Sequence, residues 1–294
     1  MSNFVVIDAP SILGLRPSGV ELLPDALRAA GLHAGLGAGY AGRIEPPPYD
    51  PIRDPDTKLL NPRALHDYSR RLAQAVTRVR ENKGIPIVLG GDCSNLIGCM
   101  LALRHAGRFG LFFIDGHADF YQPEVEPNGE VASMDLAIVS GRGPDVLADI
   151  DGLRPLVRDD DIVAFGYRDA AQQAEYGSQD IRATPIRVWT LDQVLESGVI
   201  EATRYAVATL SLERLDGLWI HIDVDVLDDM IMPAVDYRMP GGMQWNDLSA
   251  ALRVLMHTRR VVGVNIGIFN PRLDPEGTIA GRLVACLVAG LATG

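Results

Sequence analysis

Cysteine is scarce in this sequence: Cys93, Cys99 and Cys286 are the only three among 294 residues, and none has CxxC spacing. An odd, sparse set of this kind argues against a disulfide framework and suggests a reducing compartment. Basic residues are also outnumbered, because 27 Lys and Arg stand against 38 Asp and Glu, a formal net charge of −11. A chain this acidic is a poor candidate for binding nucleic acid or an anionic membrane.

Long apolar runs are missing as well. No stretch approaches the ~18 uninterrupted apolar residues of a membrane span, and the apolar run at 283–291 is short. The N-terminus enters a strand-like run at 4–7 without the basic and apolar regions of a signal peptide. We therefore expect a cytoplasmic protein without membrane or nucleic-acid partners, whose 47% hydrophobic content allows a sizeable core.

Short apolar runs alternate with helical patterns along the chain. The predicted strands are at 4–7, 85–89, 111–114, 162–165, 186–189, 218–224 and 261–268. The predicted helices are at 22–30, 62–82, 95–104, 191–196, 205–215 and 245–257. This alternation predicts an α/β fold with a mainly parallel sheet, in which sites form at the carboxyl ends of the strands.

Polar side chains follow the predicted strand at 111–114. Asp115, His117 and Asp119 occur at every second position after the apolar run. Side chains alternate between the faces of a strand, so all three would project to one side if the strand geometry continued. Carboxylate and imidazole groups together suit Mn, Zn or Fe. Taken alone, the motif is equally consistent with a turn or a helix cap.

A second cluster of this kind lies in the predicted strand at 218–224 and just after it. His221, Asp223 and Asp225 share one strand face, whereas positions 220, 222 and 224 are apolar and predicted to be core. Two carboxylates side by side on a buried face repel each other unless a cation lies between them. The alternative, one capping Asp and one solvated Asp, is weakened by the similar cluster elsewhere in the chain.

With a third segment, these motifs resemble those of the arginase/agmatinase family, the ureohydrolases. The metal motifs of that family are GGDHS, DAHAD and S-x-D-V-D. In the same order, this chain has Gly90-Gly91-Asp92-Cys93-Ser94, Asp115-Gly116-His117-Ala118-Asp119 and His221-Ile222-Asp223-Val224-Asp225. The resemblance covers nearly the whole chain and implies one domain over 1–294 with the three-layer α/β/α sandwich of the arginase fold. Three motifs in order are a strong signal.

The resemblance also implies a centre of two divalent metal ions, with Mn as the expected metal. Its ligands would be Asp115 and Asp223 as bridges, Cys93 and Asp119 on one ion, and His117 and Asp225 on the other. A metal pair ~3.5–4 Å apart lowers the pKa of a bridging water and clamps the attacked group. Asp119 would also orient the hydroxide. A small-molecule substrate and a homo-oligomer, trimer or hexamer, are further implications.

One departure from the family lies in the proposed ligands. Cys93 stands where the family has a histidine, and a thiolate is softer than imidazole and favours Zn or Fe over Mn. Metal binding would deprotonate this thiol. The alternative is that Cys93 is a small buried residue beside a weak or empty metal position.

The residues at the predicted substrate-binding positions also differ from the family pattern. Aligning on Phe269-Asn270-Pro271 places Ile268 where the family has a substrate-binding Glu that pairs with a guanidinium. An apolar Ile cannot replace that partner, and a buried guanidinium without one is costly. On the same predicted strand, Asn265 replaces a usual Asp.

The loop that carries the proton-shuttling His of arginases, G-N-L-H-G-M-P, is altered too. Here it reads Gly129-Glu130-Val131-Ala132-Ser133-Met134-Asp135, so Ala132 takes the His position. Glu130 could take over acid–base work, or it could be a solvated loop residue. His221, in place of a family Ser, could be a hydrogen-bond donor, a base, a replacement ligand beside Cys93 or a structural histidine.

We therefore expect a metal-dependent hydrolase of a non-peptide C–N bond that uses a metal-bridging hydroxide. Without the Glu, a neutral or N-modified amidine, a hydroxyguanidine or a linear amide is a better substrate than arginine or agmatine. Two alternatives remain open. One is a non-catalytic subunit with the arginase fold, and the other is a deacetylase-like hydrolase, because histone deacetylases share the general fold.

Overall fold

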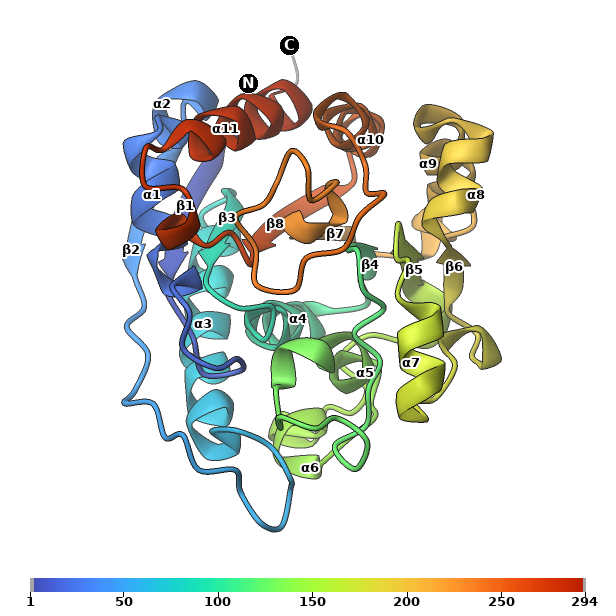
Figure 1. Ribbon diagram of the computed structural model, residues 1–294. Coiled ribbons are helices and arrows are strands. Elements are labelled where there is room, and N and C mark those ends of the chain that lie inside the picture. Colours follow the sequence, from blue (N-terminus) through green and yellow to red (C-terminus); the bar gives the residue numbers. More distant parts are fainter. Residues whose placement is uncertain (1–2, 293–294) are drawn as a thin grey trace.

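The computed structural model describes residues 3–292, and its strands form one sheet in which every pairing is parallel (Figure 1). The strand order is β2-β1-β3-β8-β7-β4-β5-β6. The strands are β1 (Phe4–Ala9), β2 (Gly39–Arg43), β3 (Ile85–Gly90), β4 (Gly110–Ile114), β5 (Ile162–Phe165), β6 (Arg187–Trp189), β7 (Leu218–Asp223) and β8 (Val261–Gly267).

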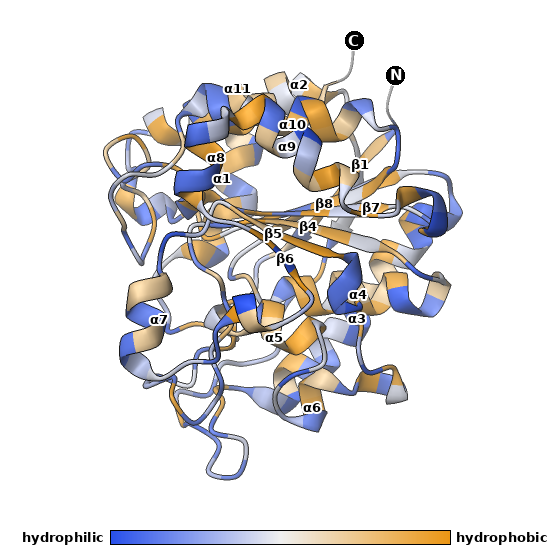
Figure 2. Ribbon diagram, turned by 90° about the vertical axis from the view of Figure 1, so that its right-hand side faces the viewer, coloured by the Kyte–Doolittle hydropathy of each residue, from blue (hydrophilic) through white to orange (hydrophobic). Residues whose placement is uncertain are grey.

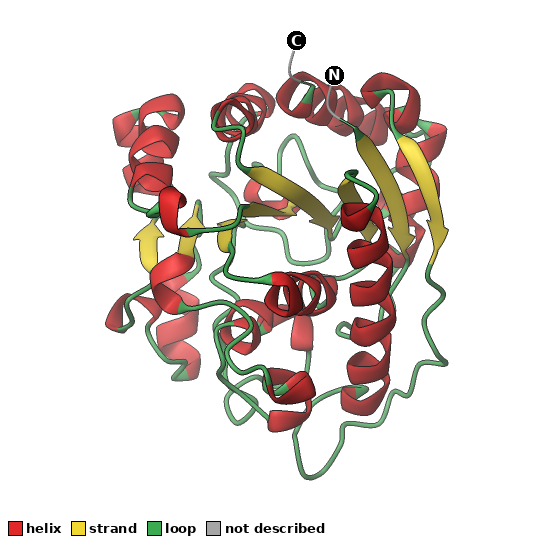
Figure 3. Cartoon of the chain, turned by 180° about the vertical axis from the view of Figure 1, so that it is seen from behind, coloured by secondary structure: helices red, strands yellow, loops and turns green. Residues whose placement is uncertain are grey.

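Helices cover both faces of the sheet. One layer holds α1 (Leu23–Ala29), α2 (Leu32–Leu36), α8 (Leu191–Ser197), α9 (Val199–Ala208), α10 (Trp245–His257) and α11 (Thr278–Leu291). The other holds α3 (Pro62–Glu81), α4 (Asn95–Ala106), α5 (Asp135–Val139), α6 (Asp145–Ala148) and α7 (Ala170–Tyr176). Figure 2 shows the sheet edge-on between the two layers, and Figure 3 shows the same sandwich from behind. The predicted three-layer α/β/α fold is therefore confirmed.

Alternation along the strands builds two cores, one on each face of the sheet. In β4, Leu111 and Phe113 pack in the core that includes α3 and α4, whereas Phe112 and Ile114 pack in the core that includes α10 and α11. These four side chains are fully buried, and burying an aromatic or aliphatic side chain contributes about 1.5–3 kcal/mol. Strands buried on both faces read as continuous apolar runs, which is why the sequence predicts them well.

Some predicted elements are wrong in detail. The predicted helix at 205–215 ends early, because α9 stops at Ala208 and a separate 3₁₀ turn forms at Leu212–Arg214. Leu210 and Leu215 are both buried, and a continuous helix would point them roughly 140° apart. Strand β2 escaped prediction because its sequence, GYAGR, holds two glycines and lies at the edge of the sheet. No helix within residues 3–292 is long and apolar enough to span a membrane.

Candidate metal centre and substrate pocket

Three strands deliver the motif residues to one edge of the sheet. The first two motifs begin at or just after the ends of β3 and β4, the third spans the end of β7, and β8 lies between β3 and β7. Parallel strands place their carboxyl ends at the same edge. The motifs therefore meet there, although Cys93 and Asp223 are 130 residues apart in the chain.

One group of potential ligands consists of Asp115, His117 and Asp225. Their nearest ligand atoms all lie within 4.8 Å of one another. His117 Nδ1 lies 2.9 Å from Asp225 Oδ2 and 3.8 Å from Asp115 Oδ1. The backbone N–H of Gly116 donates to Asp225 Oδ1 at 3.1 Å, which fixes that carboxylate. This group joins the loop after β4 to the turn after β7.

The strand geometry that would place Asp115, His117 and Asp119 on one face does not continue past Ile114. Strand β4 ends at Ile114, so the motif lies on a loop. Asp119 adopts a left-handed backbone with φ of 43°. This conformation turns the chain, and Asp119 enters the pocket described below without joining the groups of close ligand atoms found among the described residues.

A second group consists of Cys93, Asp115 and Asp223, again within 4.8 Å. The Cys93 Sγ donates to Asp223 Oδ2 at 2.9 Å. The loop that carries Cys93 turns inward at Gly91, where an added Cβ would lie 1.8 Å from the carbonyl oxygen of Ser11. Only glycine permits this close approach of two backbone segments.

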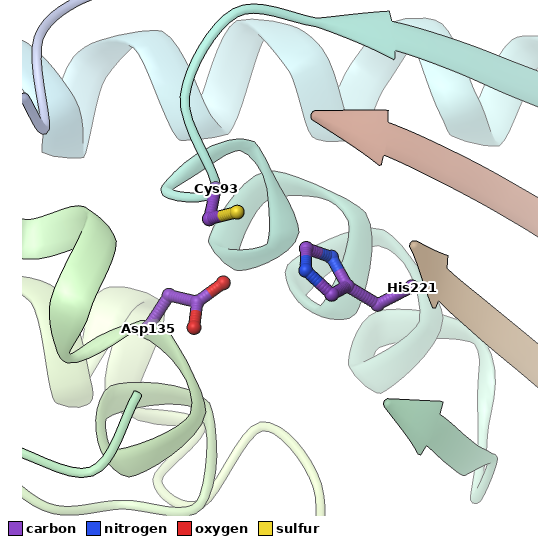
Figure 4. Close-up of side chains that lie close together, drawn as sticks. All are labelled: Cys93, Asp135 and His221. Atoms are coloured by element: carbon purple, nitrogen blue, oxygen red, sulfur yellow. The ribbon is translucent and has the colours of Figure 1, made fainter. Parts of the chain in front are cut away.

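A third group consists of Cys93, Asp135 and His221, whose side chains point toward one another in Figure 4. All three are at most 1% exposed. Among the residues that the structure describes, neither carboxylate oxygen of Asp135 has a partner at good hydrogen-bond geometry, nor does His221 Nε2, although the Leu136 backbone N–H and the Asp119 side chain lie near Asp135. Buried polar atoms without partners are costly, so this group of atoms calls for a further binding partner.

The tautomer of His221 follows from its neighbours on β7 and β8. Trp219 Nε1–H donates to Asn265 Oδ1 at 2.7 Å, and an indole nitrogen can only donate. The amide nitrogen of Asn265 therefore faces His221 Nδ1, 2.7 Å away, and donates to it. His221 accordingly carries its proton on Nε2. Burial lowers the pKa of His221 to about 3, so the ring is neutral.

The carboxylates of the centre are crowded. Burial, followed by repulsion among the group, raises the pKa values of Asp115, Asp119, Asp135 and Asp223 well above the ordinary value for Asp. Burial and the neighbouring carboxylates likewise raise the pKa of the Cys93 thiol. Without added cations, these groups cannot all be ionised at neutral pH.

His117 and Asp225 form the one strong ion pair of this cluster among the described residues. Burial lowers the pKa of His117, but the charge of Asp225 and its hydrogen bond outweigh burial and raise the pKa to about 9. Burial raises the pKa of Asp225, but the His117 charge dominates and lowers it overall.

The three groups together fit a pair of divalent ions. The first and second groups share Asp115, and the second and third share Cys93. Together they offer oxygen, nitrogen and sulfur ligands. Their unpaired buried atoms include Asp115 Oδ2 as well as those of Asp135. Cations would compensate both the crowded negative charge and the missing hydrogen bonds.

A pocket opens beside these groups. Four of the predicted ligands line it: His117, Asp119, Asp223 and Asp225. The remaining lining includes Tyr121, Tyr176 and Tyr237, and no Lys or Arg belongs to the described lining. In Figure 1 the long segment between β7 and α10, which carries Tyr237, lies in front of β7 and β8.

The residues predicted to contact substrate also line this pocket. Ile268 lies there with a left-handed φ of 72°, a strained conformation for a β-branched residue. Ala132 and Glu130 lie there as well. Glu130 is not solvated, as one interpretation of the sequence had it, but 2% exposed. It accepts hydrogen bonds from the Arg16 backbone N–H and the Tyr237 hydroxyl.

Asp135 and Tyr237 are the residues that sequence reasoning missed. Asp135 has a detectable signal, since it stands at the proline of the G-N-L-H-G-M-P loop. Tyr237 has none, because its contact with Glu130 spans 107 residues and depends on the fold.

Comparisons with known proteins agree with this geometry. A sequence model described as "Arginase family" matches residues 2–293. The chain belongs to the arginase family. It is 28% identical to an arginase of Staphylococcus aureus strain COL over 95% of this chain and 94% of the relative. An arginase of Bacillus subtilis is 29% identical, with 96% of each chain covered.

Solved structures show the same fold. An arginase from Bacillus cereus superposes with a TM-score of 0.88 at 25% identity, covering 100% of this chain and 99% of that chain. The Bacillus caldovelox arginase gives 0.88 at 27% identity with the same coverage. Membership in the arginase family supports an enzyme that hydrolyses C–N bonds of guanidino or amidino groups with bound metal.

Proposed function

We propose that this arginase-family chain is a metal-dependent hydrolase of a non-peptide C–N bond in a small molecule, a guanidine, amidine or linear amide other than arginine or agmatine. The observation that supports this proposal is one pocket with two kinds of lining. Ligand-type side chains such as Asp119 and Asp223 line it together with the apolar Ile268.

The proposed ligands are those that the family resemblance implies. Two divalent ions bound there, with Mn as the family's usual metal, would supply an activated water at neutral pH and polarise the attacked group. Asp119, which is 6% exposed and lines the pocket, would accept a hydrogen bond from that water and orient it. His221 is fully buried and absent from the lining, so it would position Asp115, 3.8 Å from its Nε2, and would not contact substrate.

The lining restricts the charge of the substrate. The described lining contains no Lys or Arg, so a substrate carboxylate would find no cationic side chain there other than His117. The family's guanidinium partner is replaced by Ile268, so a protonated guanidinium at that position would lose a charge-assisted bond. A reacting group that is neutral fits both features. Glu130, which accepts a hydrogen bond from the Tyr237 hydroxyl, would serve as a hydrogen-bond acceptor for the substrate in the pocket.

A metal-loaded screen tests this proposal. Purified protein incubated with Mn²⁺ and a panel of guanidines, amidines and linear amides should release ammonia or urea from at least one neutral substrate, with little urea from arginine or agmatine. Brisk turnover of arginine or agmatine would contradict the substrate assignment. Failure of every C–N substrate would favour a non-catalytic subunit.

A single substitution tests whether catalysis takes place at the proposed metal centre. Asp223→Asn removes a proposed bridging carboxylate and should abolish the activity found in the screen and lower the bound metal below two ions per chain. The exposed Asp160→Asn, at the amino end of β5, should change neither quantity. If Asp223→Asn keeps full activity, catalysis at this centre is refuted.

A cytoplasmic location and a trimeric or hexameric assembly complete the proposal, both supported by the family resemblance. Light scattering of the eluted protein during size-exclusion chromatography would measure the assembly directly. A monomeric mass would contradict it.

A further inference from the structure

Three residues that differ from the family pattern lie together in the fold. Cys93 replaces a ligand histidine, His221 replaces a serine, and Asp135 replaces the proline of the altered loop. They lie on different segments, after β3, in β7 and at the start of α5, yet their ligand atoms lie within 4.8 Å of one another. Such a meeting of three departures points to one altered site.

The Cys93 sulfur is the common member of two groups. It lies within 4.8 Å of a carboxylate oxygen on each of Asp115, Asp223 and Asp135. Ligand atoms around a four-coordinate zinc ion stand roughly 3.3–3.7 Å apart, given metal–ligand bonds of ~2.0–2.3 Å. The oxygens of Asp135 are near the sulfur but make no hydrogen bond within the described chain. A separation of at most 4.8 Å allows one ion to contact both the sulfur and the carboxylate.

His221 does not belong to this ligand set. Its Nδ1 accepts a hydrogen bond from Asn265, whose orientation is fixed by Trp219, so its Nε2 carries the proton. A protonated ring nitrogen has no lone pair for a metal. The Nε2–H can instead donate to a carboxylate of the centre, and Asp115 Oδ2 lies 3.8 Å away.

The altered group also lies away from substrate. Cys93, Asp135 and His221 are absent from the lining of the pocket and at most 1% exposed. An unpaired buried carboxylate that cannot reach substrate is not explained by substrate recognition. A ligand role explains its burial, its missing hydrogen bonds and its place beside a thiol.

We propose that Asp135 is a metal ligand and that it binds, with the Cys93 sulfur and beside the group of Asp115 and Asp223, one ion of the centre at a position that prefers a thiophilic divalent ion, Zn²⁺ or Fe²⁺, to Mn²⁺. This inference rests on the proposed metal-dependent function. Binding displaces the thiol proton of Cys93, which leaves to solvent, and the sulfur bonds to the metal as a thiolate. The second position, with His117 and Asp225, contains no sulfur and keeps the family's ligand types.

Cobalt spectroscopy tests the inference without measuring activity. Metal-free protein titrated with Co²⁺ should bind two ions per chain and show a thiolate-to-cobalt charge-transfer band in the near ultraviolet. Cys93→Ser should lose the band. The buried Cys99→Ser, in α4, is the matched control and should keep it.

Asp135→Asn tests the new ligand. It should lower the affinity of the thiolate-containing position for Co²⁺ by at least ~10-fold, because substitutions of residues that merely support metal ligands already lower affinity by that factor. It should also shift the visible cobalt bands. Asp274→Asn alters another buried carboxylate, which accepts a hydrogen bond from the Ala280 backbone, and should leave affinity and spectrum unchanged. An Asp135→Asn spectrum and affinity equal to wild type would overturn the role of Asp135.

Competition between metals separates this inference from the proposed function. Wild-type protein should retain Zn²⁺ at one position against excess Mn²⁺, whereas Cys93→His should take up two Mn²⁺ ions. Two bound cobalt ions without a charge-transfer band would overturn the thiolate position and leave the proposed hydrolase intact. A chain that binds no divalent metal would overturn both.

Discussion

Replacing Trp219 with Phe tests the hydrogen-bond chain that orients His221. The indole N–H is the group that fixes the amide of Asn265, and both residues are buried. In the Phe variant the amide can rotate, so its oxygen can face His221 Nδ1 as readily as its nitrogen does. We therefore expect His221 to populate both neutral tautomers in place of the Nε2–H form alone.

The stability cost follows from the same contacts. Trp219→Phe leaves the buried Oδ1 of Asn265 without its donor, which costs about 1–3 kcal/mol. Asn265→Leu leaves two groups unpaired, Trp219 Nε1–H and His221 Nδ1, and should cost about 2–6 kcal/mol on the same scale. In the double variant the Trp–Asn bond is lost only once, so its cost should fall below the sum of the singles by about 0.5–3 kcal/mol.

Two measurements check these expectations. Long-range proton–nitrogen correlation spectra of metal-free protein labelled with ¹⁵N-histidine report which ring nitrogen carries the proton, and His221→Ser identifies the signal among the six histidines. Chemical unfolding of the single and double variants gives the coupling energy. A wild-type His221 protonated on Nδ1, or costs that add to within ~0.5 kcal/mol, would refute the hydrogen-bond chain.

Three further predictions concern other parts of the site. Ile268→Glu supplies a charge-assisted partner for a guanidinium, worth about 1.5–3 kcal/mol. Measured by urea release, it should raise kcat/KM for arginine or agmatine by roughly 10- to 150-fold. The uncharged Ile268→Gln should not raise it. In metal-free protein, the raised pKa of His117, about 9 against an ordinary value of 6.5, stabilises the fold below pH 6.5. That contribution, about 3 kcal/mol at ~1.4 kcal/mol per unit, should vanish as pH rises through about 9, and urea unfolding should show no such loss in His117→Asn. Gly91→Ala forces its Cβ to 1.8 Å from the Ser11 carbonyl oxygen, so soluble expression should yield no folded protein or one destabilised by more than ~4 kcal/mol.

The sheet and its site were predictable because buried parallel strands leave a simple pattern. The run before Asp115 is apolar on both faces, the run that leads to Asp223 is apolar on one face, and their polar ends carry recognisable motifs. The face assignment holds within β7, since Ile220 and Ile222 are in the core, whereas Asp225 lies beyond the strand in the 3₁₀ turn at Val224–Val226. Edge strand β2 left no such pattern, because its residues are mostly exposed.

The sequence shows that Asp135 replaces the loop proline, but the ligand role proposed for it could not be predicted, for a physical reason. An Asp in the first turn of a short helix is ordinarily explained by the helix dipole and by solvent, and that is where Asp135 lies, at the start of α5. Its approach to Cys93 arises only when the loop folds under the sheet edge. The burial of Glu130 was missed for a similar reason, because the tyrosine that donates to it lies 107 residues later in the sequence.

The separation of Cys93 from Asp223 in the sequence also means that the ribosome makes Cys93 well before its hydrogen-bond partner. With a separation of 130 residues and chain growth of roughly 5–20 residues per second, the thiol emerges roughly 7–26 s before the carboxylate that accepts its hydrogen bond. During that interval Cys93 belongs to an unfinished sheet, and it is open to oxidants and to stray metal ions. In the finished protein it is 1% exposed, so oxidative damage to this site should fall mainly on newly made chains.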